Sequence, residues 1–180
     1  MGIAREPVLV KLFIAITFNK KASYNKIIDI LKIKFGEIDF YYGPIAFNFT
    51  NYYEDEMGKE LQKTYMTFVK KIKREELSEI KVYTNHLEQQ NSENQKRIIN
   101  IDPGYLASDK LVLASTKDFY HRIYIGNGIF AEVTLHYRKG HWRYFSWTYP
   151  DYKTNEFFTF LDKTRADYMK QIRMRENKEG

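Results

Sequence analysis

Three short polar stretches in the second half of the chain carry the side chains best suited to acid–base chemistry and to binding an anion. The first stretch is residues 100–105, where Asp102 stands directly before Pro103. Because a residue before proline is held in the extended region, we expect a strand that runs into a Pro-Gly turn, with the Asp102 carboxylate projecting from its end. The structural alternative is ordinary turn chemistry, in which the aspartate only supports the turn.

The second stretch gathers donors, acceptors and a titratable ring in Lys117, Asp118, His121 and Arg122. An imidazole changes its charge near neutral pH and is therefore suited to moving a proton, whereas the cations are suited to a phosphate. The alternative for His121 is a buried histidine whose ring is satisfied by a backbone partner.

The third stretch, residues 147–152, is an aromatic loop with a single carboxylate, and its alternative is a packing plug before the last helix. From the three stretches and their neighbours we take Asp102, His121 and Glu132 as candidate catalytic residues. The candidate ligand-binding residues are Lys110, Lys117, Asp118, Arg122, Tyr105, Trp147, Tyr149 and Asp151.

Several familiar chemistries are excluded by the residues themselves. The chain has no cysteine, which removes disulfides, thiolate catalysis and cysteine zinc sites. Neither a G-x-S-x-G nucleophile elbow nor a G-x-x-x-x-G-K-[ST] phosphate loop occurs. His136 and His141 lack the helical spacing of a zinc-binding pair, and no carboxylates are spaced as in a calcium loop. We therefore predict no metal site, and the sequence points to no particular cofactor.

The composition permits an anionic partner. The formal net charge is +6, which attracts a nucleotide or RNA, although the basic residues are spread along the chain. Aromatic residues reach 17%, which predicts a β-rich core or, where rings are exposed beside basic groups, a stacking surface. We find no DNA-binding motif and no aromatic RNA-recognition signature.

Length and hydropathy predict one domain over residues 1–180. Its compact part extends from about residue 7 to about residue 173, followed by a charged and frayed tail. The first residues lack the apolar core of a signal peptide, and no run approaches the roughly 20 apolar residues that span a membrane. By elimination we expect a cytoplasmic protein without a membrane partner, and the oligomeric state stays open.

An α+β fold must position the polar stretches. The predicted order β-α-β-β-α-β suggests a ferredoxin-like layer of two helices over an antiparallel sheet, extended by an antiparallel hairpin and a C-terminal helix. Residues 111–115 are open between helix and strand. We predict strands at residues 8–18, 38–42 (ending at Gly43-Pro44), 61–72, 97–101 and 141–147, and helices at residues 23–36, 75–90 and 154–173.

The register of the hairpin across residues 126–128 follows from its hydrophobic pattern. With a three-residue loop, Ile125 pairs with Ile129, His121 joins an apolar face, and Arg122 stands opposite Glu132 on a polar face. A two-residue turn would mix charged and aliphatic side chains on one face, so the pattern favours the longer loop. The resulting ion pair contributes about 0.2–1 kcal/mol if it is exposed.

Motifs spread over the chain also carry a family resemblance. They are FNFTNYY at residues 47–53, NIDPGYL at 100–106, KLVLA at 110–114, TKDF at 116–119, HRIY at 121–124, AEVTL at 131–135 and WTYPDY at 147–152. Together they resemble an uncharacterised prokaryotic family, domain of unknown function forty-four sixteen, over essentially the whole chain. The resemblance implies no established activity, cofactor or catalytic residue. Members often carry the label GTP-binding protein, which makes GTP one candidate nucleotide, but the residues here do not support that label by a usual mechanism. The segment nearest to a guanine-reading N-K-x-D is Thr116-Lys117-Asp118, whose aspartate comes one place too early.

Three hypotheses about function follow. The first is a binding protein for an anionic ligand, either a nucleotide such as GTP or RNA. The second is a small enzyme for a phosphorylated or nucleotide-like substrate, in which the catalytic candidates converge with Lys110, Lys117 and Arg122 on one pocket. The third is a protein-interaction module that uses the aromatic loops at residues 47–53 and 147–152. The sequence leaves open whether the protein is an enzyme.

Overall fold

The first strand, β1 (Val10–Phe18), lies inside the sheet and is buried along its whole length. Its even-numbered side chains pack in one apolar core, whereas Phe13 and Ala15 pack in a second core on the opposite face. Because successive side chains of a strand point to opposite faces, a strand that is covered on both faces is apolar nearly throughout, as predicted here. The computed structural model describes residues 2–50, 54–93 and 96–179.

The protein is α+β, with an 8-stranded antiparallel sheet in the order β10-β9-β7-β6-β1-β3-β2 and with β8 paired to β9. β8 pairs with the beginning of β9 and β10 with its end, so these two strands share one edge of β9. The strands are β2 (Ile38–Ala46), β3 (Gln62–Ile72), β6 (Ile99–Leu106), β7 (Lys110–Ser115), β8 (Ile123–Gly126), β9 (Ile129–Arg138) and β10 (His141–Tyr144), besides a 2-stranded ladder of β4 (Ser92–Glu93) and β5 (Lys96–Arg97).

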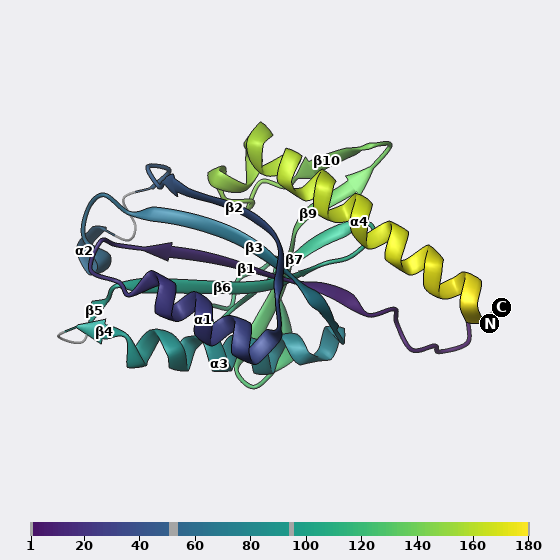
Figure 1. The fold of residues 1–180 in the computed structure, drawn as a ribbon, viewed down its shortest axis with the longest axis horizontal. Helices are drawn as coiled ribbons and strands as arrows, with labels where there is room; N and C mark the ends of the chain where they lie inside the picture. The colour runs from purple at the N-terminus through teal and green to yellow at the C-terminus, as the bar shows by residue number, and fades with distance from the viewer. Residues whose placement is uncertain (1, 51–53, 94–95, 180) are drawn as a thin grey trace.

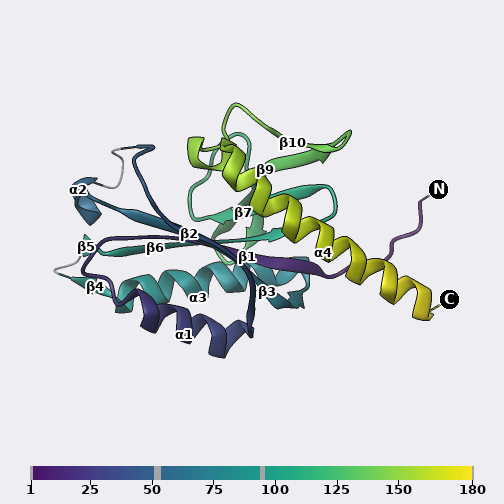
Figure 2. The same ribbon diagram turned by 45° about the horizontal axis from the view of Figure 1, so that its top comes forward.

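Helices cover both faces of the sheet. Figures 1 and 2 show α1 and α3 on one side and α4 crossing the other, with both chain termini at the same end of the molecule. Ile27 and Leu31 of α1 pack in the first core, and Phe157 and Leu161 of α4 pack in the second. The helices are α1 (Tyr24–Phe35), α2 (Glu54–Met57), α3 (Leu77–Gln90) and α4 (Asn155–Glu179), with 3-10 turns η1 (Arg74–Glu76) and η2 (Pro150–Lys153).

Two predicted turns are strand interior instead. β2 continues through Gly43-Pro44, which fall in an irregularity of its pairing with β3 between Tyr42 and Ile45, and an edge strand tolerates proline at such a bulge. β6 continues through Pro103-Gly104 to Leu106, so the prediction of a Pro-Gly turn after Asp102 is wrong.

The reason for Pro103-Gly104 lies in how β6 meets β7. The two strands pair only from Gly104 to Leu106, where a Cβ on Gly104 would lie 2.2 Å from the carbonyl oxygen of Val112. Before Gly104 the strands separate, and α3 supplies partners for the main chain of Ile101. Glu88 Oε1 accepts from its N–H at 2.7 Å, and the Lys81 ammonium donates to its carbonyl at 2.8 Å. Pro103 comes two residues after Ile101, so its main-chain nitrogen points toward α3 as well, and its missing N–H costs no hydrogen bond between strands.

The hairpin keeps the predicted register but not the predicted loop. Ile123 lies opposite Ala131 as expected, yet the loop closes as a two-residue Asn127-Gly128 turn with a bulge before Gly126. The predicted pairing of Ile125 with Ile129 is therefore wrong, because Gly126 lies opposite Ile129. Asn127 and Gly128 both have positive φ, at 55° and 72°, which suits the turn that best matches strand twist.

The remaining differences concern element ends. Residues 111–115 are strand β7, and α4 extends past residue 173 to Glu179, because its last residues are strong helix formers. Residues 51–53 of the predicted aromatic loop and Gly180 of the predicted tail lie outside the described residues.

Candidate functional site

One face of β9 is polar, and the side chains on this face make up the central part of the candidate site. The odd-numbered side chains, from Ile129 to Tyr137, pack in apolar cores, as the alternation predicts. We call the opposite side the polar face of β9; its members are Phe130, Glu132, Thr134, His136 and Arg138.

A buried ion pair lies at the start of this face. The Arg122 Nε–H donates to Glu132 Oε2 at 2.7 Å, and His121 Nε2 lies 3.1 Å from the same oxygen. The guanidinium also donates to Ser115 Oγ at 3.0 Å and to the Lys117 carbonyl at 2.9 Å. Both charged side chains are at most 5% exposed, so the predicted pair is buried and the free energy given for an exposed pair does not apply.

The residues before β8 explain why His121 is here rather than on the apolar face. The main chain turns at this point, with the Arg122 N–H donating to the Phe119 carbonyl at 2.9 Å, so strand alternation does not extend back to His121. Burial lowers the pKa of Arg122, but the hydrogen bonds and charges of Glu132 and Tyr149 outweigh burial and raise it. The guanidinium is therefore a permanent cation.

A column of stacked rings connects the ion pair to the far end of the polar face. Phe119 stacks on His121 with 5.9 Å between ring centroids, His121 on Trp147 at 5.0 Å, and Trp147 on Phe145 at 4.6 Å. The planes in these pairs differ by only 7°, 10° and 2°. Phe145 then meets His136 at 5.0 Å. We call these five residues the ring column.

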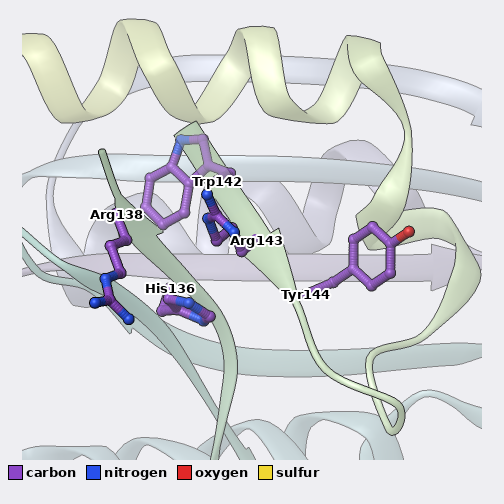
Figure 3. A pocket seen from close by; sticks show the side chains of 5 residues that line it. All are labelled: His136, Arg138, Trp142, Arg143 and Tyr144. Atoms are coloured by element: carbon purple, nitrogen blue, oxygen red, sulfur yellow. The ribbon is translucent and has the colours of Figure 1, made fainter. Parts of the chain in front are cut away.

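A pocket of about 390 Å³ opens at the His136 end of the column, between β9 and β10 (Figure 3). His136 lies opposite Arg143 in the strand pairing, so both side chains share a face, and Arg138 follows two positions later. Arg138 and Arg143 form no ion pair with any carboxylate of the described residues. The lining residues are His136, Arg138, Trp142, Arg143 and Tyr144.

Sequence reasoning missed most of this pocket, although a signal is present. Residues 133–150 contain no aspartate or glutamate, yet they include Arg138, Lys139 and Arg143. A long acid-free segment with a high aromatic content indicates an uncompensated basic surface. Among the predicted residues, Lys110 lies opposite the pocket residue His136, on β7, where it also forms an ion pair with Asp109 at 3.6 Å.

Asp151 lies in the interior, away from solvent. Its Oδ2 accepts from the Lys63 ammonium at 2.6 Å and from the Tyr65 hydroxyl at 2.8 Å. The ammonium is also within 5.0 Å of the ring centroids of Phe47 and Tyr152. The contacts of Asp151 with Lys63 and Tyr65 therefore hold η2 against β3.

Asp102 belongs to a second polar cluster on β6. It lies 3.4 Å from the Lys81 ammonium and accepts from Asn100 Nδ2 at 2.6 Å. Arg97 donates to the Asn100 side chain and holds Glu88 at 3.2 Å. Burial raises the pKa of the Glu88 carboxyl, which Lys81 only partly offsets.

The other predicted residues, Lys117, Tyr105 and Asp118, lie outside the candidate site. The Arg97 guanidinium hydrogen-bonds both carboxylate oxygens of Glu56 at 2.7 Å, which lowers the Glu56 pKa, and the Lys117 ammonium adds to this effect. Tyr105 packs between the apolar cores with the Arg74 guanidinium 6.0 Å from its ring centroid. Asp118 is exposed in the turn before β8.

The structure thus brings together five of the predicted residues: His121, Arg122, Glu132, Trp147 and Tyr149. In the described part of the chain, no three His, Asp or Glu side chains are grouped to hold a metal ion. Within the same residues, no helix has the length and hydropathy to cross a membrane.

The comparisons with known proteins place the chain in a family without assigning a function. A family model described as Domain of unknown function (DUF4416) matches residues 8–168. This match includes the whole polar face of β9, the ring column and the pocket. No curated protein and no solved structure matches the chain. The predicted membership is confirmed: the chain belongs to the DUF4416 family, a domain of unknown function.

Proposed function

We propose that the protein binds an anionic ligand with a planar ring, a nucleotide or RNA, in the pocket between β9 and β10. The observation that carries this proposal is the lining of the pocket, in which His136, Arg138 and Arg143 stand beside two aromatic rings without a carboxylate (Figure 3). A guanidinium binds phosphate oxygens through paired hydrogen bonds, and an aromatic ring stacks on a base.

Charge and size both support this ligand class. The arginines have no carboxylate partner among the described residues, so a bound phosphate would replace water rather than break an existing ion pair. The volume of about 390 Å³ falls within the usual range for small-molecule sites.

Binding is favoured over acid–base catalysis by the surroundings of His121. Phe119 and Trp147 cover its two ring faces, Nε2 faces Glu132, and Nδ1 is buried. A substrate would have to displace the column to reach either nitrogen. The geometry therefore favours a role for His121 in holding the stacked rings rather than in transferring a proton.

The architecture is consistent with a binding module. The order β6-β1-β3-β2, with α1 and α3 on one face, supports a ferredoxin-like class for this part of the sheet. The proposed site lies on strands β9 and β10, which extend the sheet beyond it. A single domain over residues 1–180 and a cytoplasmic location remain predictions.

Calorimetric titration tests the proposal directly. We expect saturable binding of GTP, GMP or AMP, and a ligand at 100 times Kd should raise the unfolding free energy by about 2.7 kcal/mol. Arg138→Gln and Arg143→Gln should each weaken binding about tenfold or more. Lys26→Gln, an exposed change on α1, is the matched control and should leave Kd unchanged. Absence of binding by every nucleotide and by a short RNA would overturn the proposal.

A further inference from the structure

We propose that the ligand is a single-stranded nucleic acid that extends from the pocket along the outside of the ring column to Tyr120. This inference rests on the proposed function and deepens it, because it states which kind of nucleotide ligand the site takes. It is drawn from three features: the extent of the ring column beyond the pocket, the spacing of the basic side chains on β7, β9 and β10, and the exposed rings around them.

The ring column extends well beyond the pocket. It follows the polar face of β9, which spans about 27 Å from Phe130 to Arg138 at roughly 3.4 Å per residue. Glu132 and Thr134 in the middle of this face are buried, because Trp147 and Thr148 hydrogen-bond to the main chain there, so the accessible surface is the outside of the column. A single nucleotide would fill the pocket without reaching the exposed ring of Tyr120 at the other end of the column.

The basic side chains form successive rows across the strands. Lys110, His136 and Arg143 stand opposite one another on β7, β9 and β10, and Arg138 stands opposite His141 in the next row. Rows on one face of a sheet repeat about every 7 Å, at alternate residues. A repeated cationic row is suited to a repeated phosphate, as in a nucleic-acid backbone, rather than to one terminal phosphate.

Exposed aromatic rings flank the ring column and the pocket. Tyr120 is 86% exposed and meets the rings of His121 and Trp147 edge-on. Tyr144, at 58% exposure, lines the pocket, and the Lys153 ammonium lies 5.0 Å from its ring centroid. Rings that are free on one side and rigidly supported on the other are the usual platform for unpaired bases.

Charge selects a nucleic acid over a protein partner for this surface. Residues 133–150, which build the pocket and part of the ring column, include three Lys or Arg side chains and no Asp or Glu. A polyanion matches this distribution along its whole length, and its binding releases condensed counterions. Unpaired bases also present flat faces to the exposed rings, which a base-paired duplex does not.

Fluorescence anisotropy with labelled oligonucleotides tests the inference. We expect oligo(U) or oligo(dT) of ten nucleotides to bind at least tenfold more tightly than UMP or GMP. The slope of log K against log salt should be negative and should lose about 0.7 for each phosphate contact removed by Arg138→Gln or Arg143→Gln. Tyr120→Ala should weaken oligonucleotide binding at least fivefold. Tyr41→Ala, at an exposed ring on β2, is the matched control and should not weaken it.

The outcomes separate this inference from the proposed function. If mononucleotides bind as tightly as the oligonucleotides, the site takes a single nucleotide, which overturns the inference and leaves the proposed function intact. If neither binds, both fail. If the oligonucleotides bind but none of the three site variants changes their affinity, another surface is responsible and the inference is wrong.

Discussion

Arg122 and Glu132 face each other across the start of the β8–β9 hairpin, with the guanidinium Nε 2.7 Å from the carboxylate and both side chains out of solvent. In a buried pair of this kind each charge stabilises the other, since either charge alone would be costly to bury. The pair also joins the turn before β8 to β9, because the same guanidinium binds Ser115 and the Lys117 carbonyl.

Removing the charge from Glu132 should therefore destabilise the protein strongly. Glu132→Gln leaves Arg122 buried without a counter-charge, and we expect the unfolding free energy to fall by about 3–5 kcal/mol. Urea denaturation measures this loss. Glu37→Gln, which breaks an exposed pair with Lys32, is the control and should change stability by less than about 0.5 kcal/mol. Equal effects of the two changes would contradict the assignment of a compensated buried pair.

Gly104 should not accept even a methyl group. In Gly104→Ala the new Cβ would lie 2.2 Å from the Val112 carbonyl oxygen, so β6 and β7 must separate at the first residue of their pairing. We expect a loss of about 1–3 kcal/mol, measured by thermal or urea unfolding. Gly2→Ala adds the same group where nothing lies within 4 Å and should be neutral. A neutral Gly104→Ala would show that the close approach of the strands is not needed.

The pH dependence of stability should carry a contribution from Glu88. Burial raises the pKa of its carboxyl in the folded protein, so the folded state keeps this proton at a pH where the unfolded state has released it. Stability from this group is complete below the unfolded pKa of about 4.3 and is lost as pH rises through the raised folded pKa. In urea unfolding between pH 4 and pH 8, Glu88→Gln should gain stability relative to wild type as pH rises. A gap that is constant or changes in the opposite direction would refute this assignment.

Ligand binding should change the intrinsic tryptophan fluorescence. The chain has 2 tryptophans, and both belong to the site: Trp142 lines the pocket and Trp147 is part of the ring column. A ligand that stacks or places a phosphate near these indoles should quench or shift their emission on titration. Trp142→Phe isolates the response of Trp147. Calorimetric binding without any change in emission from the wild-type protein would place the ligand elsewhere.

The spacing of apolar and polar side chains correctly predicted those strands in which this spacing alone determines which side chains are buried. The uniformly apolar residues 10–18 predicted a strand buried on both faces, and the alternation in β9 predicted both its register and the meeting of Arg122 with Glu132. These predictions hold because the period of a strand is short and local, so a shift by one residue would exchange buried and exposed side chains.

The sequence by itself determined the α+β class, the family and the pairing of one carboxylate with one guanidinium. Only the tertiary structure decided which polar residues are buried and which meet in a site. Asp151 became a partner of Lys63 on β3, and Pro103 became strand interior because α3 supplies the hydrogen bonds that β7 does not. The pocket of His136, Arg138 and Arg143 depends on the pairing of β9 with β10, and the loop after β10 brings Phe145 against His136 and Trp147 against Phe145. Such contacts join residues far apart in the chain or on adjacent strands, and their physical basis is packing in three dimensions, which no local pattern records.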